Sequence, residues 1–114
     1  MEFDVESHFS GCSDVVRQIY DDLVTAACTF GPVEEDPKKT SIHLNRKTAF
    51  AGVQTRRNYL LLTIKSDVSL DNERIFKIEK ASANRWHAEV KLIDPAEVDS
   101  EVINWLKNAY RISN

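Results

Sequence analysis

The stretch KKTSIHLNRKTAFAGVQTRRNYLLLTIK, residues 38–65, decides the fold of this chain. It holds seven of the fifteen basic residues and no acidic residue, and it is also the most strand-like part of the sequence. Short runs of β-branched and aromatic residues, separated by turn-forming residues, are typical of antiparallel strands. The sheet is therefore expected to begin here, and the same stretch is expected to give the surface its main basic patch.

Alternation of residue types predicts the first strand of this stretch. Ile42 and Leu44 are apolar and should face the core. His43 lies between them and should face outward, because successive side chains of a strand point to opposite faces. Residues 45–48 then predict a tight turn, since asparagine and other polar residues favour chain reversal.

Two further strands follow within the stretch. Phe50 and Val53 anchor a return strand, in which Gly52 is expected to allow a β-bulge or the close approach of another segment. After a turn at residues 56–58, residues 59–65 form a nearly continuous apolar run. Such a run predicts a central strand with both faces covered.

An amphipathic helix is predicted before the stretch, over residues 13–30. Ser13 can cap it and Asp14 suits its first turn, while Gly31 followed by Pro32 ends it. Its apolar stripe recurs at steps of three and four residues and consists of Val16, Ile19, Tyr20, Leu23, Ala26, Ala27 and Phe30.

The segments on either side of this helix are expected to be irregular. Residues 1–12 have no clean period, so they predict an arm that Phe3, Val5 and Phe9 hold against the domain. Residues 33–39 change sharply from acidic to basic and predict a turn at the surface.

Two more strands are predicted downstream of the stretch, at residues 75–80 and 86–92. The second strand alternates clearly, so each of its faces can be assigned. Its core face consists of Trp86, Ala88, Val90 and Leu92, and its outer face consists of His87, Glu89 and Lys91.

A capped helix is predicted after the last strand. Asp94 suits the N-cap, Pro95 the first position and Glu97 the third position of a capping box. The helix itself is expected to settle only from Asp99, and Tyr110 near its end should contact the sheet edge. Its apolar stripe consists of Val98, Val102, Trp105, Leu106 and Ala109.

The order of elements predicts an α+β fold with an N-terminal helix, a four- to five-stranded mostly antiparallel sheet, and a C-terminal helix in two layers. Strands that follow one another without intervening helices exclude a doubly wound parallel sheet. We assign residues 1–12 to an irregular N-terminal arm and residues 13–114 to a single domain.

Charge is distributed very unevenly along the chain. The net charge of −3 argues against a dedicated nucleic-acid binder. However, residues 1–36 carry −8, residues 37–66 carry +7, and the rest carries −2. This segregation indicates either an anionic partner for the basic part or an acidic helix that packs beside a basic sheet edge.

Composition also bounds the class of protein. The apolar fraction of 42% and the charged fraction of 29% are those of an ordinary globular domain. The first residues, MEFDVESH, are acidic where a signal peptide would be basic, and no apolar run is long enough for a membrane span. Cys12 and Cys28 form no paired motif, so reduced thiols are expected. Cys28 falls near the end of the predicted first helix, and we expect its side chain to pack against the domain and not to react. We therefore expect a cytoplasmic protein without membrane contact.

Several segments occur together in an order that resembles a known family. They are FSG at 9–11, FGPV at 30–33, KKTSIHL at 38–44, AFAGV at 49–53, RRNYLLL at 56–62 and the terminal VDSEVINWLKNAYRIS. In this combination the chain resembles the domain-of-unknown-function 5655 family over roughly residues 8–113. That family is similar in pattern to small bacterial domains of the MmcQ/YjbR type, and copies of it are appended to nuclease-like proteins. The resemblance implies an accessory module linked to nucleic acid, and it implies no catalytic residue.

The strongest candidate site is a cluster of cations at predicted strand ends. It consists of Lys38, Lys39, Arg46, Lys47, Arg56 and Arg57. Cations of this kind neutralise phosphates, and the neighbouring Phe50 and Tyr59 could stack on bases if they are exposed. The alternative is that both aromatic residues belong to the core and that the cations only keep the sheet edge from pairing.

Other constellations in the sequence are weaker. Trp86, His87 and Trp105 could line a small pocket between the sheet and the last helix, although tryptophans in a small domain usually belong to the core. No spacing typical of zinc ligands and no Gly-rich phosphate loop occurs, so no metal site or cofactor is expected. No nucleophile motif occurs either, and we expect no enzyme activity.

Two functions remain open at this point. The first is a non-catalytic binding or accessory module whose basic face, within residues 38–57, binds an anionic partner such as nucleic acid. The second is a module for protein interaction or self-association, through the acidic first helix or a strand edge, with no nucleic-acid binding. The sequence leaves the oligomeric state and the strand order undetermined.

Overall fold

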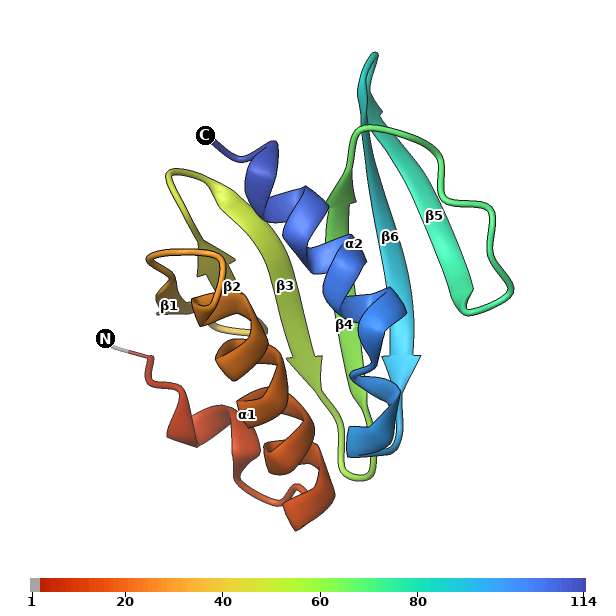
Figure 1. The fold of residues 1–114 in the computed structure, drawn as a ribbon. Coiled ribbons are helices and arrows are strands. Elements are labelled where there is room, and N and C mark those ends of the chain that lie inside the picture. Colours follow the sequence, from red (N-terminus) through yellow and green to blue (C-terminus); the bar gives the residue numbers. More distant parts are fainter. Residues whose placement is uncertain (1–2) are drawn as a thin grey trace.

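A computed structural model describes residues 3–114, which form a six-stranded antiparallel sheet with two helices on one face (Figure 1). In chain order the elements are the 3-10 helix η1 (Glu6–Phe9), α1 (Asp14–Cys28), β1 (Glu34–Pro37), β2 (Ile42–Asn45), β3 (Ala49–Thr55), β4 (Leu60–Ser66), β5 (Ile75–Ser82), β6 (Arg85–Leu92), the 3-10 helix η2 (Pro95–Glu97) and α2 (Ser100–Arg111). The strands lie side by side in the order β1-β2-β3-β4-β6-β5. The predicted two-layer α+β fold with a helix at each end is confirmed.

The sheet has six strands where four or five were predicted, because β1 occupies the segment that was predicted to be a turn. Its sequence, EEDP, is a poor strand former, but β1 lies at an edge, where proline is tolerated. Side chains hold it in place. Tyr20 on α1 donates a hydrogen bond to Glu35, and Asn45 on β2 donates to Glu34 at 3.1 Å. The prediction of a surface turn at residues 33–39 is therefore wrong for Glu34–Pro37, which form β1. Lys38 and Lys39 do lie in a turn, between β1 and β2.

The core lies between the helices and the covered face of the sheet. Strand register places apolar residues opposite one another in rows that cross the sheet, such as Ile42, Val53, Leu62 and Val90. All four are at most 1% exposed, as are the predicted stripe residues Val16, Ile19, Tyr20, Leu23 and Ala27 of α1. Burial of this continuous apolar surface is the main stabilising contribution to the fold.

The middle strands differ from the prediction in two respects. The β-bulge lies at Phe50, because Leu44 pairs with Ala51 and Asn45 pairs with Ala49. Both Phe50 and Ala51 are consequently buried on the helix side, while Gly52 pairs regularly with His43 and Thr63. The other difference concerns β4, whose residues alternate between buried and half-buried. Only one face of β4 is covered by helices, so the prediction that both faces are covered is wrong.

The C-terminal helix begins as predicted. Asp94 and Glu97 form a capping box around η2, and Asp99 then caps α2 by accepting a hydrogen bond from the Val102 amide at 3.2 Å. A terminal turn that satisfies its own amides in this way fixes where the helix starts. The predicted start from Asp99 is confirmed.

Tyr110, near the end of α2, packs into the core and joins three segments. Its ring lies 5.3 Å from the Phe50 ring and 5.8 Å from the Phe30 ring, and its hydroxyl donates to the Pro32 carbonyl at 2.9 Å. The predicted contact with the sheet is thus made with β3 from inside the core and not at a sheet edge.

The N-terminal arm contains η1, and its first two residues lie outside the described part of the chain. Val5 and Phe9 pack against the core, and the Phe9 ring lies 5.1 Å from that of Tyr20. Phe3, also predicted as an anchor, is 40% exposed. Cys28 is exposed as well, so the prediction that it packs is wrong. Among residues 3–114, no helix has the length and apolar character that a membrane crossing requires.

Candidate anion-binding face

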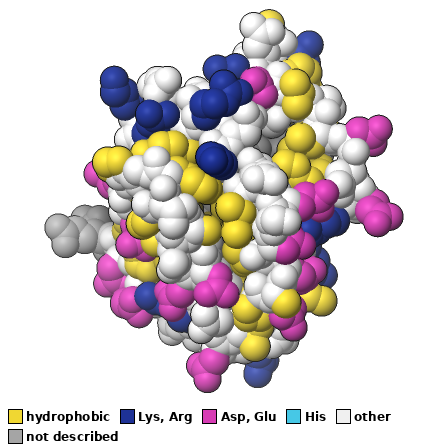
Figure 2. All heavy atoms as spheres, viewed as in Figure 1, with side chains coloured by type: hydrophobic (Ala, Val, Ile, Leu, Met, Phe, Trp, Pro, Cys, Tyr) yellow, Lys and Arg dark blue, Asp and Glu magenta, His cyan; other side chains and the backbone are white. Residues whose placement is uncertain are grey.

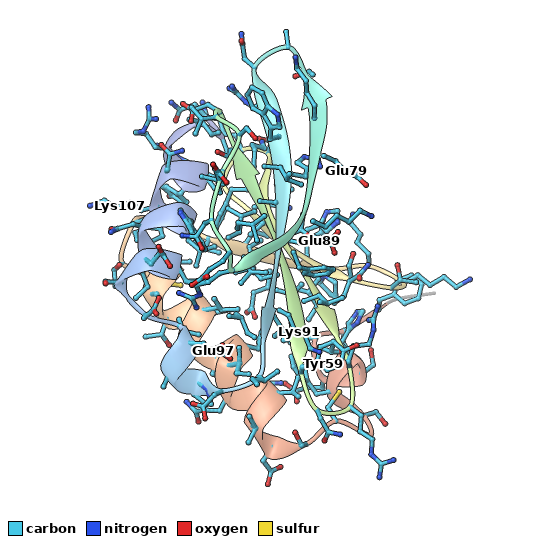
Figure 3. The ribbon with its side chains drawn as sticks, turned by 90° about the vertical axis from the view of Figure 1, so that its right-hand side faces the viewer. Tyr59, Glu79, Glu89, Lys91, Glu97 and Lys107 are labelled. Atoms are coloured by element: carbon cyan, nitrogen blue, oxygen red, sulfur yellow. The ribbon has the colours of Figure 1, made fainter. Side chains whose placement is uncertain are left out.

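The face of the sheet opposite the helices is uncovered, and it is referred to below as the open face. Strand alternation places His43 of β2, Gly52 of β3, Thr63 of β4 and Glu89 of β6 in one row across it. Figure 3 shows Tyr59, Glu79, Glu89 and Lys91 on this helix-free side and Lys107 on the helix side. Antiparallel sheets commonly pack one face on the core and expose the other face, with polar side chains, to solvent.

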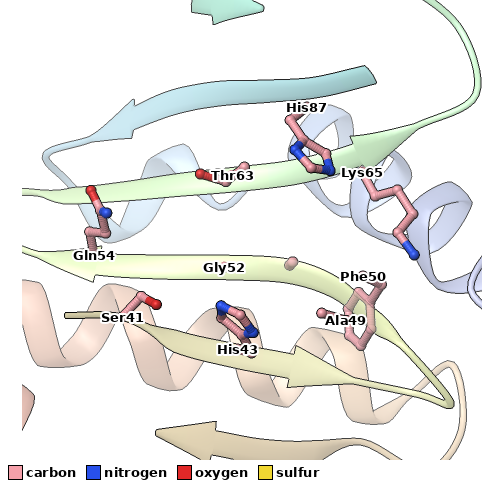
Figure 4. A pocket seen from close by; sticks show the side chains of 10 residues that line it. Ser41, His43, Ala49, Phe50, Gly52, Gln54, Thr63, Lys65 and His87 are labelled. Carbon is pink, nitrogen blue, oxygen red and sulfur yellow. The ribbon is translucent and has the colours of Figure 1, made fainter. Parts of the chain in front are cut away.

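A hollow of about 260 Å³ lies in the middle of the open face (Figure 4). It is lined by Ser41, His43, Ala49, Phe50, Ala51, Gly52, Gln54, Thr63, Lys65 and His87. The hollow exists because small residues, Ala49 and Gly52, form its floor, whereas the longer side chains of His43 and His87 rise on either side from β2 and β6. The polar groups come from four neighbouring strands or their ends, and none of these ten lining residues is acidic.

Lys65 is the charged group of the hollow. Its Nζ donates a hydrogen bond to Thr48 Oγ1 at 3.1 Å, and no carboxylate of residues 3–114 forms an ion pair with it. Partial burial lowers the pKa of Lys65, and the positive charge of Arg85 lowers it further. Both effects disfavour the charged ammonium form of Lys65. An anion bound beside Lys65 would offset them, because its negative charge would stabilise the ammonium group.

Most cations of the described chain are without a carboxylate partner. Five of the fifteen make an ion pair within 4.0 Å, namely Arg17, Lys38, Arg74, Lys77 and Arg111. Among the unpaired ones, Lys65, Arg85 and Lys91 lie on outward strand positions of the open face, and Arg56 reaches Gln54 on the same face at 3.3 Å. These four residues are called the open-face cations below. They run along β4 and β6 from one end of the sheet to the other.

Acidic residues also lie on the open face, and three of them, Asp36, Glu79 and Glu89, are ion-paired. Asp36, opposite His43 on β1, lies 2.9 Å from Lys38, and the hydrogen bond from Lys38 lowers the pKa of that carboxyl. On the other side, Glu89 lies 3.7 Å from Lys77 on β5. Glu79 shares the same Lys77, at 3.0 Å, and Glu89 lies between His87 and Lys91 on β6, so the open face carries its unpaired cations on both sides of one lysine-paired carboxylate.

The helix-covered face carries many acidic side chains, and α1 contributes several of them. Figure 2 shows acidic side chains over the lower half and the right-hand side of the helix-covered face, with lysines and arginines gathered toward the top. Within α1 the acids Asp14, Asp21 and Asp22 outnumber the single cation Arg17. The C-terminal helix α2 instead holds two cations, Lys107 and Arg111, against Glu101, and the acids Glu34, Glu35 and Asp36 belong to β1, so the charge segregation along the sequence becomes only in part a segregation between the two layers.

The six cations predicted from the sequence are divided between the two ends of the sheet. Antiparallel connection places the turns that carry Lys38, Lys39, Arg56 and Arg57 at one end and the turn that carries Arg46 and Lys47 at the other. The seven residues of β3 separate the ends by about 20 Å. Arg46 also has a structural contact, because its guanidinium lies 4.5 Å from the Tyr110 ring centre and donates to the Tyr110 carbonyl at 3.0 Å. The six cations therefore do not form one cluster.

The residues predicted to line a second pocket are separated as well. Trp86 points to the helix side of β6, where Lys80 lies 5.6 Å from its ring, and Trp105 lies 5.9 Å from Arg74. His87 is on the opposite face and lines the hollow. The three side chains consequently share no pocket, but His87 belongs to the candidate site.

Of the aromatic residues near the cations, Phe50 is fully buried, whereas Tyr59 is half-buried on the open face with Lys91 4.3 Å from its ring centre. Within residues 3–114 no three His, Cys, Asp or Glu side chains are arranged to hold a metal ion. Both cysteines are free thiols.

The sequence prediction missed Lys65, Arg85 and Lys91 because it considered turns and not the outer face of the strands. A signal for them was present. Alternation had already placed His43, His87 and Lys91 on outward positions. Leu62 and Ile64 of β4 are buried, so alternation also places Lys65, the next residue after Ile64, on the outward face. What alternation could not supply was the strand order, which brings β2 and β6 to either side of β3 and β4.

Comparison with known proteins gives one match. The model of a family described as "Domain of unknown function (DUF5655)" matches residues 5–113. No curated protein and no solved structure matches the chain. The match therefore extends over both helices and all six strands, and its description names no activity or ligand.

Proposed function

This chain belongs to the DUF5655 family, and we propose that it is a non-catalytic binding module whose open face binds an anionic polymer, single-stranded nucleic acid being the partner that fits best. The observation that carries the proposal is the set of open-face cations that have no carboxylate partner among residues 3–114 and lie on an uncovered sheet. Unpaired cations on one face attract phosphates and release counterions when they bind.

The spacing of these cations favours a polymer over a small ion. Lys91 pairs with Leu61, and His87 pairs with Lys65, so Lys91 and Lys65 lie four strand positions apart, or about 13 Å. Arg56 and Arg85 extend this stripe at its two ends. A strand of a few nucleotides could contact all four cations at once, and Tyr59 could stack beneath a base at one end if Lys91 moved off its ring.

The binding test is an NMR titration of labelled protein with a short single-stranded oligonucleotide and with a duplex, at low salt and near 0.2 M salt. We expect shifts on β3, β4 and β6, and a log-log dependence of affinity on salt of about −3 for four neutralised phosphates. The variant Lys91→Glu should weaken binding, whereas Lys107→Glu makes the same charge change on the helix side and should not. Shifts confined to α1 and α2, or an unchanged spectrum at millimolar ligand, would contradict the proposal.

A second candidate function, association with a protein or with another copy, is favoured by the β5 edge. Phe76 is 58% exposed, Ile78 is 37% exposed and Val68 in the preceding loop is 54% exposed. An edge strand with exposed apolar side chains can accept a further strand from a partner. Such binding would respond little to salt, so the titration above separates the two functions.

We further propose that the protein works in the cytoplasm. Two free thiols without any disulfide among residues 3–114 support a reducing compartment. A domain that needs reduced cysteines should lose stability or ligand binding when an oxidant replaces the reducing agent in the buffer.

A further inference from the structure

We propose that the hollow on the open face is a binding site for a phosphate monoester. This inference deepens the proposed function and rests on it, since it assigns the hollow to the end of a bound strand. The open-face cations would hold the internal phosphates, and the hollow would take a terminal phosphate. A free phosphate or mononucleotide has the same chemistry, and the experiment below distinguishes these sources.

The donors of the hollow converge from several sides. His43 on β2 and His87 on β6 stand on either side of β3 and β4, while Thr63 and Lys65 come from β4 itself. Gln54 and Ser41 add an amide and a hydroxyl at one end. A phosphate monoester offers three terminal oxygens and nearly two negative charges, so it can use donors from three directions at once.

The charge around the hollow favours a dianion over a neutral ligand. Lys65 lies near a second cation, Arg85, and the partial burial of its ammonium group is not offset by a carboxylate. The nearest acids are Asp36, opposite His43, and Glu79 and Glu89, which pair with His87 and Thr63. Asp36 is paired with Lys38 at 2.9 Å, whereas Glu79 and Glu89 share Lys77, at 3.0 and 3.7 Å. The acids therefore border the site without filling its centre.

The size of the hollow fits a phosphate together with part of a sugar. Its volume of about 260 Å³ lies just below the range of about 300–1,000 Å³ that is usual for small-molecule pockets. An internal diester in an extended strand would have to leave the hollow at both sides. A terminal group enters from one side only, which suits a hollow bordered by His43 and His87.

Gly52 provides a way to close the hollow without removing a charge. A Cβ built on Gly52 would lie 3.9 Å from Thr63 Cβ and 4.0 Å from His43 Cδ2, which are ordinary contact distances. Its backbone φ is not among the positive values of this chain, and β-branched residues suit a strand. The variant Gly52→Val should therefore fold while its methyl groups occupy the floor of the hollow.

The experiment compares one single-stranded hexanucleotide in two forms, with a 5′-phosphate and with a 5′-hydroxyl, together with inorganic phosphate alone. We expect the phosphorylated form to bind at least about tenfold more tightly, as for one added charge-assisted contact. Ring signals of His43 and His87 should shift with the phosphorylated strand and with inorganic phosphate. The preference should disappear in Gly52→Val and in Lys65→Gln, and it should persist in the matched control Lys107→Gln on the helix side.

The outcomes separate this inference from the proposed function. Equal, salt-dependent affinity for both oligonucleotides would overturn the phosphate site and leave the open face as a nucleic-acid surface. Phosphate-dependent shifts of both histidines without binding of either oligonucleotide would support a site for free phosphate and overturn the proposed function. Histidine signals that respond to none of the three ligands would overturn the inference, and so would an unchanged preference in a folded Gly52→Val variant.

Discussion

The variant Gly31→Ala should destabilise the domain more than any other replacement of a glycine in this chain. Gly31 has a φ of +147°, which L side chains rarely adopt, and a Cβ there would lie 2.5 Å from Tyr110 Oη. The backbone conformation alone should cost about 1–3 kcal/mol. Displacing the Tyr110 hydroxyl from the Pro32 carbonyl should add about 1 kcal/mol for the lost hydrogen bond.

The control for the backbone contribution is Gly11→Ala. Gly11 also has a positive φ, +79°, but a Cβ at this position meets no atom within 4 Å. This variant should therefore lose about 1–2 kcal/mol of stability, which is the cost of a left-handed conformation without any collision. Gly31→Ala should lose about 2–4 kcal/mol, or roughly 8–16 °C in Tm for a domain of this size.

The assay is denaturant unfolding of both variants, of Tyr110→Phe, and of the double variant Gly31→Ala with Tyr110→Phe. Removing the hydroxyl removes the atom that the new Cβ approaches, so the double variant should be about 1 kcal/mol more stable than additivity predicts. Additive losses, or a Gly31→Ala variant no less stable than Gly11→Ala, would refute the argument that Tyr110 requires a glycine at this position.

Further outcomes follow from other contacts. Asp99→Ala should cost about 1 kcal/mol, because the N-cap of α2 is lost. The hydrogen bond from Arg74 holds the pKa of Asp99 below its usual value, so the advantage of wild type over Asp99→Asn should be complete at neutral pH and shrink as the pH falls below about 4, as acid unfolding monitored by circular dichroism would show. Lys65→Met should raise Tm slightly while it abolishes phosphate binding, since burial disfavours the charged lysine at neutral pH; a lower Tm would contradict this. Arg46→Ala should lose about 0.5–1 kcal/mol and Lys47→Ala almost nothing, because only Arg46 contacts Tyr110; equal chemical stability of the two would contradict it. Cys28 is exposed and Cys12 is half-buried, so Cys28 should react with a small maleimide much faster, as mass spectrometry at short times would show; equal rates would contradict this difference in exposure.

Much of the fold could be predicted from residues whose local preferences agree with their tertiary environment. The stripe of α1, the alternation in β6 and the capping box at Asp94 each specify an element without knowledge of the rest. β1 could not be predicted in this way. Its strand conformation depends on hydrogen bonds from residues of other elements. Tyr20 of α1 donates to Glu35, and Asn45 of β2 donates to Glu34.

The candidate site was predicted only in its chemical character. A basic surface was expected from residues 38–65, and the open face draws Arg56 and Lys65 from that stretch. The arrangement depends on two facts of topology that no local pattern contains. Both helices cover the same face, and β6 rather than β5 lies next to β4, which brings His87 beside Lys65. The turn cations are separated for a different reason, because successive turns of consecutive antiparallel strands lie at opposite ends of the sheet.

The position of β5 at the edge has a consequence for the motions of the domain. β5 hydrogen bonds only to β6, and seven of its eight residues are exposed. Its detachment would therefore uncover little apolar surface, and its amide protons should exchange with solvent through a partial opening far less costly than global unfolding. β3 and β4 are hydrogen bonded on both sides and support the helices, so their amides should exchange last. The domain would thus combine a rigid floor, on which ligand donors keep their spacing, with a border strand that can open and close independently.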